Sequence, residues 1–293
     1  TGIASVEVTS LGCHTDLWCP KSGTFSSLVE SLSLEGKFPP LRSAFDALGV
    51  LRPELADEIG LSNFVQVHCG IHDSNASLLA HLLDHKPSFS VVSTGTWVVS
   101  FAVGGDLNGL DPKRDTLANV DAYGRAVPSA RYMGGREFDL MTEGLEAPSL
   151  SERTGILDEV LKRGIMALPS AVPGCGPYPD RRLRWVNAEG ASSEACYVAA
   201  CLYAALMTET CLDLLGADGP IIVEGPFAAN SFYLSALAGF SEREVIAVSG
   251  ATGTASGAGL LAGAAIPVMH SQRYLADIDQ YKDYKKQWVN LAN

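Results

Sequence analysis

Residues 64–97, FVQVHCGIHDSNASLLAHLLDHKPSFSVVSTGTW, contain the segments that decide the fold. The first eight residues are rich in strand-forming side chains, and SNASLLAHLLDH has the apolar spacing of a helix. Lys86-Pro87-Ser88 is a break. Two β-branched runs then flank Thr94-Gly95-Thr96, which is the pattern of a β-hairpin. The stretch predicts a strand that feeds a helix, followed by a domain boundary near residue 88.

The second half of the chain repeats the alternation of strands and helices. Residues 191–217 predict one long, mostly buried helix, with Ser192 or Ser193 at its start and Gly216 at its end. PIIVEG and REVIAVSG predict strands, and the patterns NSFYLSALAGF and TASGAGLLAGAAI predict the helices that follow them. The last twenty residues predict a polar amphipathic helix. The fold class is therefore α/β.

Composition limits the possible partners. The chain has 293 residues and a formal net charge of -12, which argues against nucleic acid or an anionic membrane surface as its main partner. An anionic small ligand remains open, because backbone N–H groups and helix N-termini can bind phosphate.

Cysteine usage and the chain ends bear on location. The seven cysteines are scattered without a C-x-x-C pair, which is typical of reduced thiols in a cytoplasmic protein. We find neither a signal peptide nor a membrane span in the sequence. The opening TGIASVEVTS reads like mid-domain sequence, so we expect the true N-terminus to lie further upstream.

Asp73 lies where the predicted strand meets the predicted helix, and it has two interpretations. Asp is among the best helix N-caps, so a purely structural role is open. Alternatively, Asp73 is a general base at the C-terminal end of a strand, where α/β proteins place ligands. The two roles can coexist.

The neighbouring His68, Cys69 and His72 raise the question of a metal site. Strand alternation places His68 and Cys69 on opposite faces, so they do not converge easily. Without a recognised ligand spacing, we expect no metal here. His72 is then either packed or part of the pocket beside Asp73.

Three glycine-containing turns could bind phosphate. STGTW (93–97) presents backbone N–H groups and two hydroxyls, although a plain hairpin is an equally simple interpretation. VEGPFAANS (223–231) and SGATGTASGAG (249–259) each follow a strand, and the second could serve close helix packing alone. None matches a Walker or Rossmann pattern. RYMGGREF (131–138) is interpreted as a loop whose Arg131 and Arg136 are solvated.

The order of these segments resembles the FGGY carbohydrate kinase family, on its rhamnulokinase and fuculokinase side. HDSNAS, STGTW, a long helix, VEGPFAAN and GTASGAG follow one another over nearly the whole chain. The resemblance implies the actin/hexokinase/Hsp70-like (ribonuclease H-like) α/β fold of a two-domain kinase, with ATP and sugar in the cleft between the domains. Residues 1–88 would be the C-terminal part of the first, sugar-binding domain, and residues 89–293 the second, nucleotide-binding domain.

The resemblance also implies roles for single residues. Asp73 matches the catalytic base and, with His72, would contact the sugar. Thr94, Gly95 and Thr96 match the second phosphate loop. Gly225 and Asn230 match the adenosine-side turn, although Glu224-Gly225-Pro226 departs from the usual run of glycines.

The implied activity is ATP-dependent phosphorylation of a sugar hydroxyl, with a ketose such as L-fuculose or L-rhamnulose as the expected substrate. ATP and Mg²⁺ would be required, no Mg²⁺ ligand is assigned within this sequence, and a homodimer is a family-level expectation. The first phosphate loop and most sugar-contacting residues of the family are not in this sequence, so the chain alone is expected to be inactive. The alternatives are a non-catalytic nucleotide- or sugar-binding protein of the same superfamily and a scaffold protein. A G-x-S-x-G elbow is missing, which disfavours an acyl-transfer hydrolase.

Overall fold

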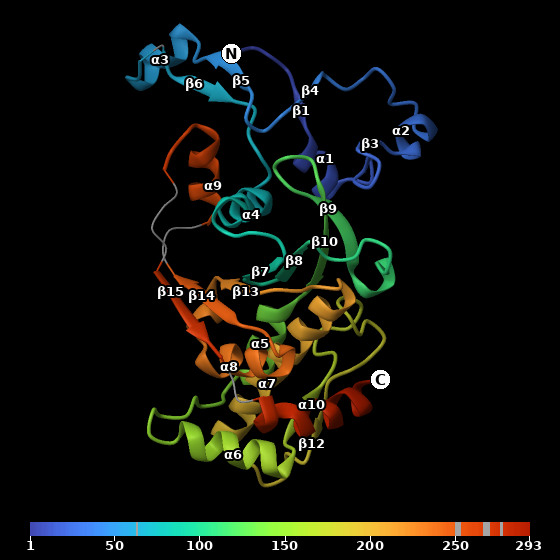
Figure 1. Ribbon diagram of the computed structural model, residues 1–293, viewed down its shortest axis with the longest axis vertical. Coiled ribbons are helices and arrows are strands. Elements are labelled where there is room, and N and C mark those ends of the chain that lie inside the picture. Colours follow the sequence, from blue (N-terminus) through green and yellow to red (C-terminus); the bar gives the residue numbers. More distant parts are fainter. Residues whose placement is uncertain (63, 250–252, 266–269, 276–277) are drawn as a thin grey trace. The chain divides into compact units, whose positions relative to one another are not determined.

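The chain folds into two compact units in a computed structural model (Figure 1). The structure describes residues 1–293 apart from 63, 250–252, 266–269 and 276–277. The first unit comprises residues 1–86, 118–127 and 250–269, and the second unit comprises residues 87–117, 128–249 and 270–293. The division into family domains at residue 88 stays a prediction.

A mixed seven-stranded sheet is the centre of the second unit. Its order is β15 (His270–Tyr274), β14 (Val245–Ser249), β13 (Ile221–Glu224), β7 (Phe89–Thr94), β8 (Val98–Val103), β10 (Ala126–Tyr132) and β9 (Thr116–Val120). Strand β13 runs parallel to both of its neighbours, β7 and β14, whereas β7 and β8 are antiparallel. Thr94 pairs with Val98 at the end of this last pair, so the hairpin predicted at residues 94–96 is confirmed.

Helices and short strands complete the second unit. They are α5 (Gly134–Thr142), α6 (Arg153–Arg163), α7 (Ser193–Leu214), α8 (Ser231–Ser241), α10 (Ile278–Ala292), the 3-10 helices η1 (Pro112–Arg114) and η2 (Pro226–Ala229), β11 (Met166–Leu168) and β12 (Arg184–Val186). RYMGGREF is not a loop, which corrects the sequence interpretation: it forms the end of β10 and the start of α5. Its two glycines allow the helix to pack closely on its neighbours, because a Cβ at Gly134 or Gly135 would collide with them.

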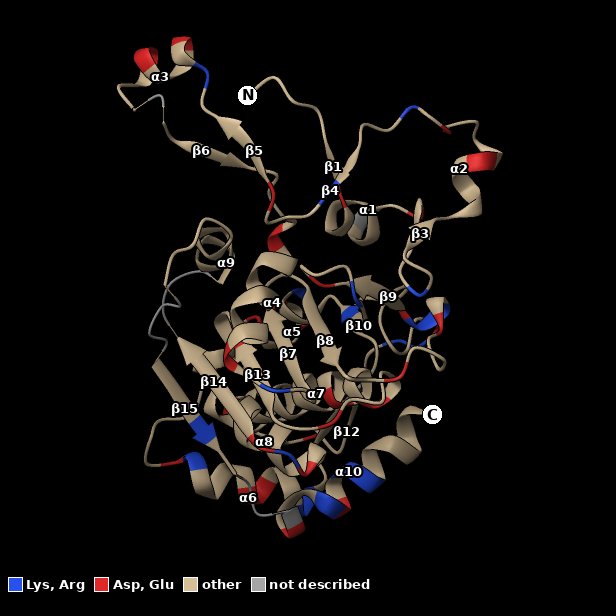
Figure 2. Ribbon diagram, turned by 45° about the horizontal axis from the view of Figure 1, so that its top comes forward, with Lys and Arg blue, Asp and Glu red and all other residues tan. Residues whose placement is uncertain are grey.

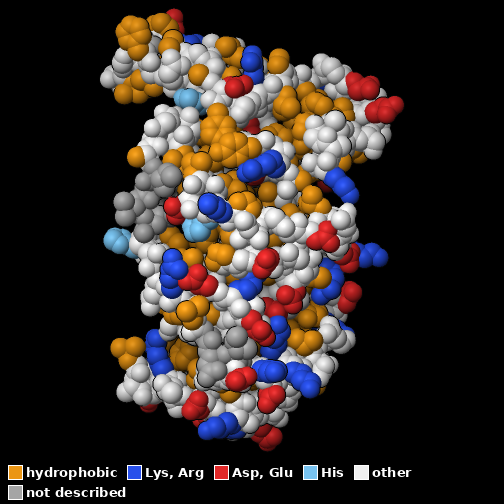
Figure 3. Space-filling view, in the orientation of Figure 1, with side chains coloured by type: hydrophobic (Ala, Val, Ile, Leu, Met, Phe, Trp, Pro, Cys, Tyr) orange, Lys and Arg blue, Asp and Glu red, His pale blue; other side chains and the backbone are white. Residues whose placement is uncertain are grey.

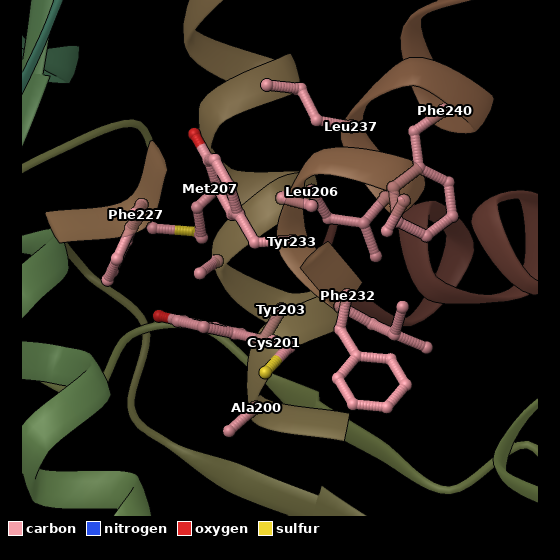
Figure 4. Packing of buried hydrophobic residues seen from close by; sticks show 14 of the residues in the cluster. Ala200, Cys201, Tyr203, Leu206, Met207, Phe227, Phe232, Tyr233, Leu237 and Phe240 are labelled. Atoms are coloured by element: carbon pink, nitrogen blue, oxygen red, sulfur yellow. The ribbon is translucent and has the colours of Figure 1, made fainter. Parts of the chain in front are cut away.

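Helix α7 is the main core helix of this unit. Ser192 caps it by accepting the Ala195 N–H at 3.1 Å, and Gly216 follows its end with φ +58°, as the sequence predicted. Side chains of α7 and α8 interlock, among them Leu206 and Tyr233 (Figure 4). By length and composition α7 could cross a membrane, but 83% of its most apolar window is buried inside the protein. That burial explains its composition as that of a core helix.

Smaller elements form the first unit. They are β1 (Val6–Glu7), α1 (Val8–His14), β2 (Trp18–Cys19), β3 (Thr24–Phe25), α2 (Ser27–Ser31), β4 (Leu41–Arg42), β5 (Ala47–Val50), α3 (Pro53–Ile59), β6 (Gln66–His68), α4 (Asp73–Asp84) and α9 (Gly253–Leu261). The strand predicted before α4 is real but short, and it pairs with β5. Helix α9 packs against α4 through Gly257, where a Cβ would lie 1.8 Å from the Ala76 carbonyl oxygen. Close packing therefore requires glycine at this position.

The two units bury their apolar side chains to different extents. Among the described residues, small clusters of buried side chains in the first unit surround Trp18 and Leu79, whereas a large cluster fills the second unit. Exposed apolar side chains gather on the first unit, including Ile59 and Phe64 (Figure 3). Acidic side chains lie on its helices α2 and α3, while α10 of the second unit carries several lysines (Figure 2).

Candidate functional site

Two turns that are far apart in the sequence meet in the second unit. Because β7 and β13 are parallel neighbours, their carboxyl ends lie at the same edge of the sheet. Thr94 is the last residue of β7, and its hydroxyl donates a hydrogen bond to the Glu224 carbonyl oxygen at 2.6 Å. The Thr94 hydroxyl oxygen also accepts the Phe227 N–H at 3.0 Å. One buried hydroxyl thus joins the predicted phosphate turn to the predicted adenosine-side turn.

Gly225 makes this junction possible. Its φ is +84°, and a Cβ there would lie 2.0 Å from the Thr94 carbonyl oxygen. Both the left-handed backbone and the lack of room require glycine. The segment Glu224-Gly225-Pro226 lacks the run of glycines expected from the resemblance, but it has glycine at the position where the close approach to Thr94 requires it.

The turn at residues 95–96 also contacts the start of α5. A Cβ at Gly135 would lie 2.1 Å from the Gly95 carbonyl oxygen, and the Arg136 N–H donates to the Thr96 carbonyl oxygen at 3.4 Å. Gly95 is exposed, and a Cβ built on it would make only an ordinary van der Waals contact with the Trp97 carbonyl oxygen at 3.8 Å. The Thr96 side chain is exposed. The turn is therefore packed against α5 on one side and exposed on the other.

A pocket of about 510 Å³ opens in front of these turns. Its walls come from the 95–96 turn, α5, α7, η2 and the starts of α6 and α8. Phe138 lies edge-on to Tyr197 and to Phe227, with ring centroids 5.7 and 5.4 Å apart. The volume is in the range of small-molecule sites, and the aromatic wall suits a planar ligand group.

Asn230 and Arg153 form the polar end of the pocket. Asn230 caps α8 by accepting the Tyr233 N–H at 3.1 Å, as its predicted cap position requires, and its amide donates to Cys201 Sγ at 3.3 Å. Arg153 donates to Ser231 Oγ at 2.5 Å.

Sequence reasoning missed Arg153. Its guanidinium lies 5.3 Å from the ring centroid of Phe232, and its Nε has no hydrogen-bond partner in the described part of the chain. It stands at the first position of α6, within no motif, and lies nearly 80 residues from Ser231. No local pattern could have pointed to it.

Glu137 fixes the pocket wall from inside. This buried carboxylate of α5 accepts hydrogen bonds from Ser170 Oγ at 2.9 Å, the Val172 N–H at 3.1 Å and the Tyr203 hydroxyl at 2.8 Å. Burial raises the pKa of Glu137, and these donors oppose that shift. The side chain therefore anchors the helix that bears Phe138.

Asp73 belongs to the first unit, where it is the first residue of α4. Its carboxylate is 70% exposed and accepts the Ser74 N–H at 2.6 Å. His72, not Asp73, occupies the cap position, so the N-cap interpretation of Asp73 is wrong. Strand β6 ends at His68, and a short link leads to α4, whose first helical residue is Asp73. The carboxylate at residue 73 is thus largely open to solvent.

The histidines and cysteine near Asp73 make contacts of their own. His72 Nδ1 lies 3.1 Å from Asn75 Oδ1 and 3.2 Å from Asp73 Oδ1. His68 Nδ1 lies 3.3 Å from the Phe45 carbonyl oxygen, and Cys69 Sγ lies 3.3 Å from Ser5 Oγ. Within the described ranges, no group of three His, Cys, Asp or Glu side chains could hold a metal ion.

The third glycine turn is described only in part. Gly250, Ala251 and Thr252 lie outside the described residues, and the rest of the motif forms α9. The Thr254 hydroxyl donates to the Asp73 carbonyl oxygen at 3.4 Å. Together with the close contact at Gly257, this supports the packing interpretation of the segment.

Comparison with known proteins gives a consistent result. A family model described as "Carbohydrate kinase FGGY, C-terminal domain" matches residues 86–271. The crystal structure of a carbohydrate kinase from Novosphingobium aromaticivorans is 37% identical, with a TM-score of 0.90 over 100% of this chain and 65% of its own. Curated protein sequences give no match.

Two more distant structures share the fold. A xylulose kinase from Rhodospirillum rubrum is 17% identical, with a TM-score of 0.77. The match covers 99% of this chain and 64% of that kinase. A Plasmodium falciparum glycerol kinase with ADP is 12% identical, with a TM-score of 0.77. The match covers 99% of this chain and 63% of that kinase. The chain thus spans slightly less than two thirds of the length of the solved structures it matches.

Proposed function

The chain belongs to the FGGY carbohydrate kinase family, with its actin/hexokinase-like α/β fold, and we propose that it supplies the nucleotide site and the general base for ATP-dependent phosphorylation of a sugar hydroxyl. The observation that carries the proposal is the junction of the two turns by Thr94 and Gly225 in front of an open pocket. The 37% identity to a carbohydrate kinase also supports the proposal.

The open turn at Gly95 and Thr96 would hold the phosphates. Gly95 is exposed with room for a Cβ at ordinary contact distance, and the exposed Thr96 follows it in the chain. Thr94 has a different task, because its hydroxyl is already hydrogen-bonded to the Glu224 turn. We therefore assign phosphate contact to Gly95 and Thr96, and assign the positioning of both turns to Thr94 and Gly225.

The aromatic wall and Arg153 would receive the nucleoside. Phe138 and Tyr197 offer edges and faces to a purine ring. Arg153 is a cation at the polar end of the pocket with hydrogen-bonding capacity to spare at Nε. Asn230 would contribute mainly by holding the start of α8, since both ends of its amide are engaged.

Asp73 would accept the proton of the sugar hydroxyl, and His72 would contact the sugar beside it. As the sugar oxygen bonds to the γ-phosphorus, the bond to the bridging oxygen breaks and ADP leaves. Such a transition state is loose, so positioning and charge neutralisation carry most of the rate, and a general base contributes about 10²–10⁴-fold. The 70% exposed carboxylate is free to meet a substrate hydroxyl.

Mg²⁺ bound to the phosphate oxygens would neutralise charge in this reaction. The described residues contain no cluster that could bind it alone, so we assign it no protein ligand here.

The substrate is proposed to be a ketose such as L-fuculose or L-rhamnulose, on the motif resemblance alone. We place the protein in the cytoplasm, since its seven cysteines are free thiols. A homodimer would follow the family pattern. Expressed by itself, this chain should bind MgATP without turning it over.

A glycine substitution tests the nucleotide site. Gly95→Ala adds a Cβ whose nearest contact is the Trp97 carbonyl oxygen at 3.8 Å, so the fold should be retained while the space for phosphate is filled. We expect MgATP to raise the melting temperature of the wild type and to raise that of the variant much less. An equal shift in both proteins would contradict the site, and no shift in either would favour a scaffold.

A further inference from the structure

The entry to helix α4 is held by a residue from far upstream. The His72 backbone N–H donates to Thr9 Oγ1 at 2.9 Å. Thr9 is fully buried in α1, 63 residues earlier in the chain. Because His72 is the cap residue of α4, its N–H has no partner within the helix and needs one from outside. Thr9 supplies that partner.

Glu7 fixes the direction of the Thr9 hydroxyl. Thr9 Oγ1 donates to Glu7 Oε2 at 2.5 Å, so its lone pair is left to face His72. Glu7 is itself 5% exposed and is held by the Thr9 N–H at 2.9 Å and the Ser10 N–H at 3.1 Å. The result is a directed chain from an N–H through a hydroxyl to a carboxylate, in which each bond polarises the next.

The residue before Asp73 is thereby fixed on both sides. Its N–H is bound by Thr9, and its carbonyl oxygen accepts the Ala76 N–H at 2.8 Å. A peptide held at both polar groups has little freedom in φ and ψ. The exposed Asp73 carboxylate follows directly, so its position depends on the link to Thr9.

We propose that Thr9, oriented by Glu7, is a positioning residue that holds the Asp73 carboxylate where it can accept the substrate proton. The inference rests on the proposed role of Asp73 as general base. A misplacement of about 1 Å in such a group can cost on the order of 10²-fold in rate. Neither Glu7 nor Thr9 touches the reacting atoms in this account.

A simpler role would be to cap α1, and the two roles can be separated. Glu7 caps α1 through the backbone N–H groups of Thr9 and Ser10, which do not involve the Thr9 hydroxyl. Thr9→Val keeps the shape of the side chain and both of those contacts, and it removes the two hydrogen bonds of the hydroxyl, to His72 and to Glu7 Oε2. Thr9→Ser keeps the hydroxyl and serves as the rescue variant.

The test uses the full-length gene product with MgATP and its best ketose from a panel that includes L-fuculose, L-rhamnulose and D-xylulose. We expect Thr9→Val to lower kcat about 10- to 100-fold with the KM for ATP within about twofold of wild type. Thr9→Ser should recover most of kcat. Val29→Ala, a buried change in α2 of the same unit, controls for general destabilisation and should keep kcat.

Three outcomes would overturn the inference. A wild-type kcat in Thr9→Val shows that the hydroxyl does not position the base. An equal loss in Thr9→Ser, or in Val29→Ala, shows that packing rather than the link to His72 matters. Substantial turnover in Asp73→Asn overturns the proposed base itself, which identifies the proposed function, rather than the Thr9 link, as the failing step.

Discussion

Thr94 Oγ1 and the Glu224 carbonyl oxygen, 130 residues apart in the chain, lie 2.6 Å apart in a partly buried hydrogen bond. The hydroxyl also accepts the Phe227 N–H, so it serves two strand ends at once. The motif resemblance assigns Thr94 to phosphate binding, but its hydroxyl links the turn that follows β7 to the turn that follows β13. Both turns line the pocket. We expect the position of those turns, and with it the proposed nucleotide binding, to depend on the Thr94 hydroxyl.

Thr94→Val should therefore weaken both stability and nucleotide binding. The change leaves the Glu224 carbonyl oxygen and the Phe227 N–H without their partner, at a cost of about 1–3 kcal/mol each when buried. Urea unfolding and calorimetric titration with MgATP would measure the two effects. Thr94→Ser, which keeps the hydroxyl, should remain close to wild type. If Thr94 instead bound phosphate alone, Thr94→Val would lose affinity without losing stability.

Gly225→Ala should be more damaging than Gly95→Ala. At residue 225 the new Cβ meets the Thr94 carbonyl oxygen and the backbone has a positive φ, whereas the space at residue 95 is open. Strain of this kind costs about 1–3 kcal/mol, and the clash adds to it. Thermal unfolding of the two variants without ligand checks the ranking. Equal melting temperatures would show that the close approach of the two turns is not required.

Arg153→Met should raise the KM for ATP with a small effect on stability. The variant keeps an unbranched apolar side chain and removes the guanidinium, which lines the pocket 5.3 Å from the Phe232 ring centroid. Hydrogen bonds from a charged group contribute about 1.5–3 kcal/mol, which corresponds to a roughly 10- to 100-fold change in KM. Steady-state kinetics at saturating sugar would measure it. An unchanged KM would remove Arg153 from the nucleotide site.

Stability should fall as pH rises through the titration of Glu209. Burial, followed by the nearby Asp213, raises the pKa of Glu209 to about 7, although Lys285 opposes the shift. Since the folded-state pKa lies above the unfolded value, the stabilisation from the protonated form is complete below about pH 4.5 and is lost by about pH 7.

Urea unfolding between pH 4.5 and 8 would reveal this slope, and Glu209→Gln is the matched control. Because the variant cannot ionise at this position, its free energy of unfolding should change less with pH over the same window. A variant with the slope of the wild type would show that another group titrates there.

Local patterns predicted much of the second unit. The hairpin at residues 94–96, the long helix with its cap at Ser192 and the cap at Asn230 all follow from side chains next to the structure they form. RYMGGREF was misread as a loop because Gly135 serves a tertiary contact with Gly95. Local sequence shows glycine as a breaker and gives no sign of the partner it must approach.

The same limit applies to the candidate site. Asp73, Gly95 and Gly225 lie in motifs and could be named from the sequence. Thr9 and Arg153 act through partners 63 and 78 residues away, at His72 and Ser231, and only the fold brings them there. Spacing along the chain could not predict contacts that are set by the pairing of distant segments.

The most direct test is the rate of ketose phosphorylation by Asp73→Asn in the full-length gene product, with the melting-temperature shift by MgATP measured on the same protein. The account predicts a fall in kcat of about 10²–10⁴-fold with an unchanged shift, because the nucleotide pocket lies on other residues. Phosphorylation at the wild-type rate would contradict the assignment of Asp73 as the base.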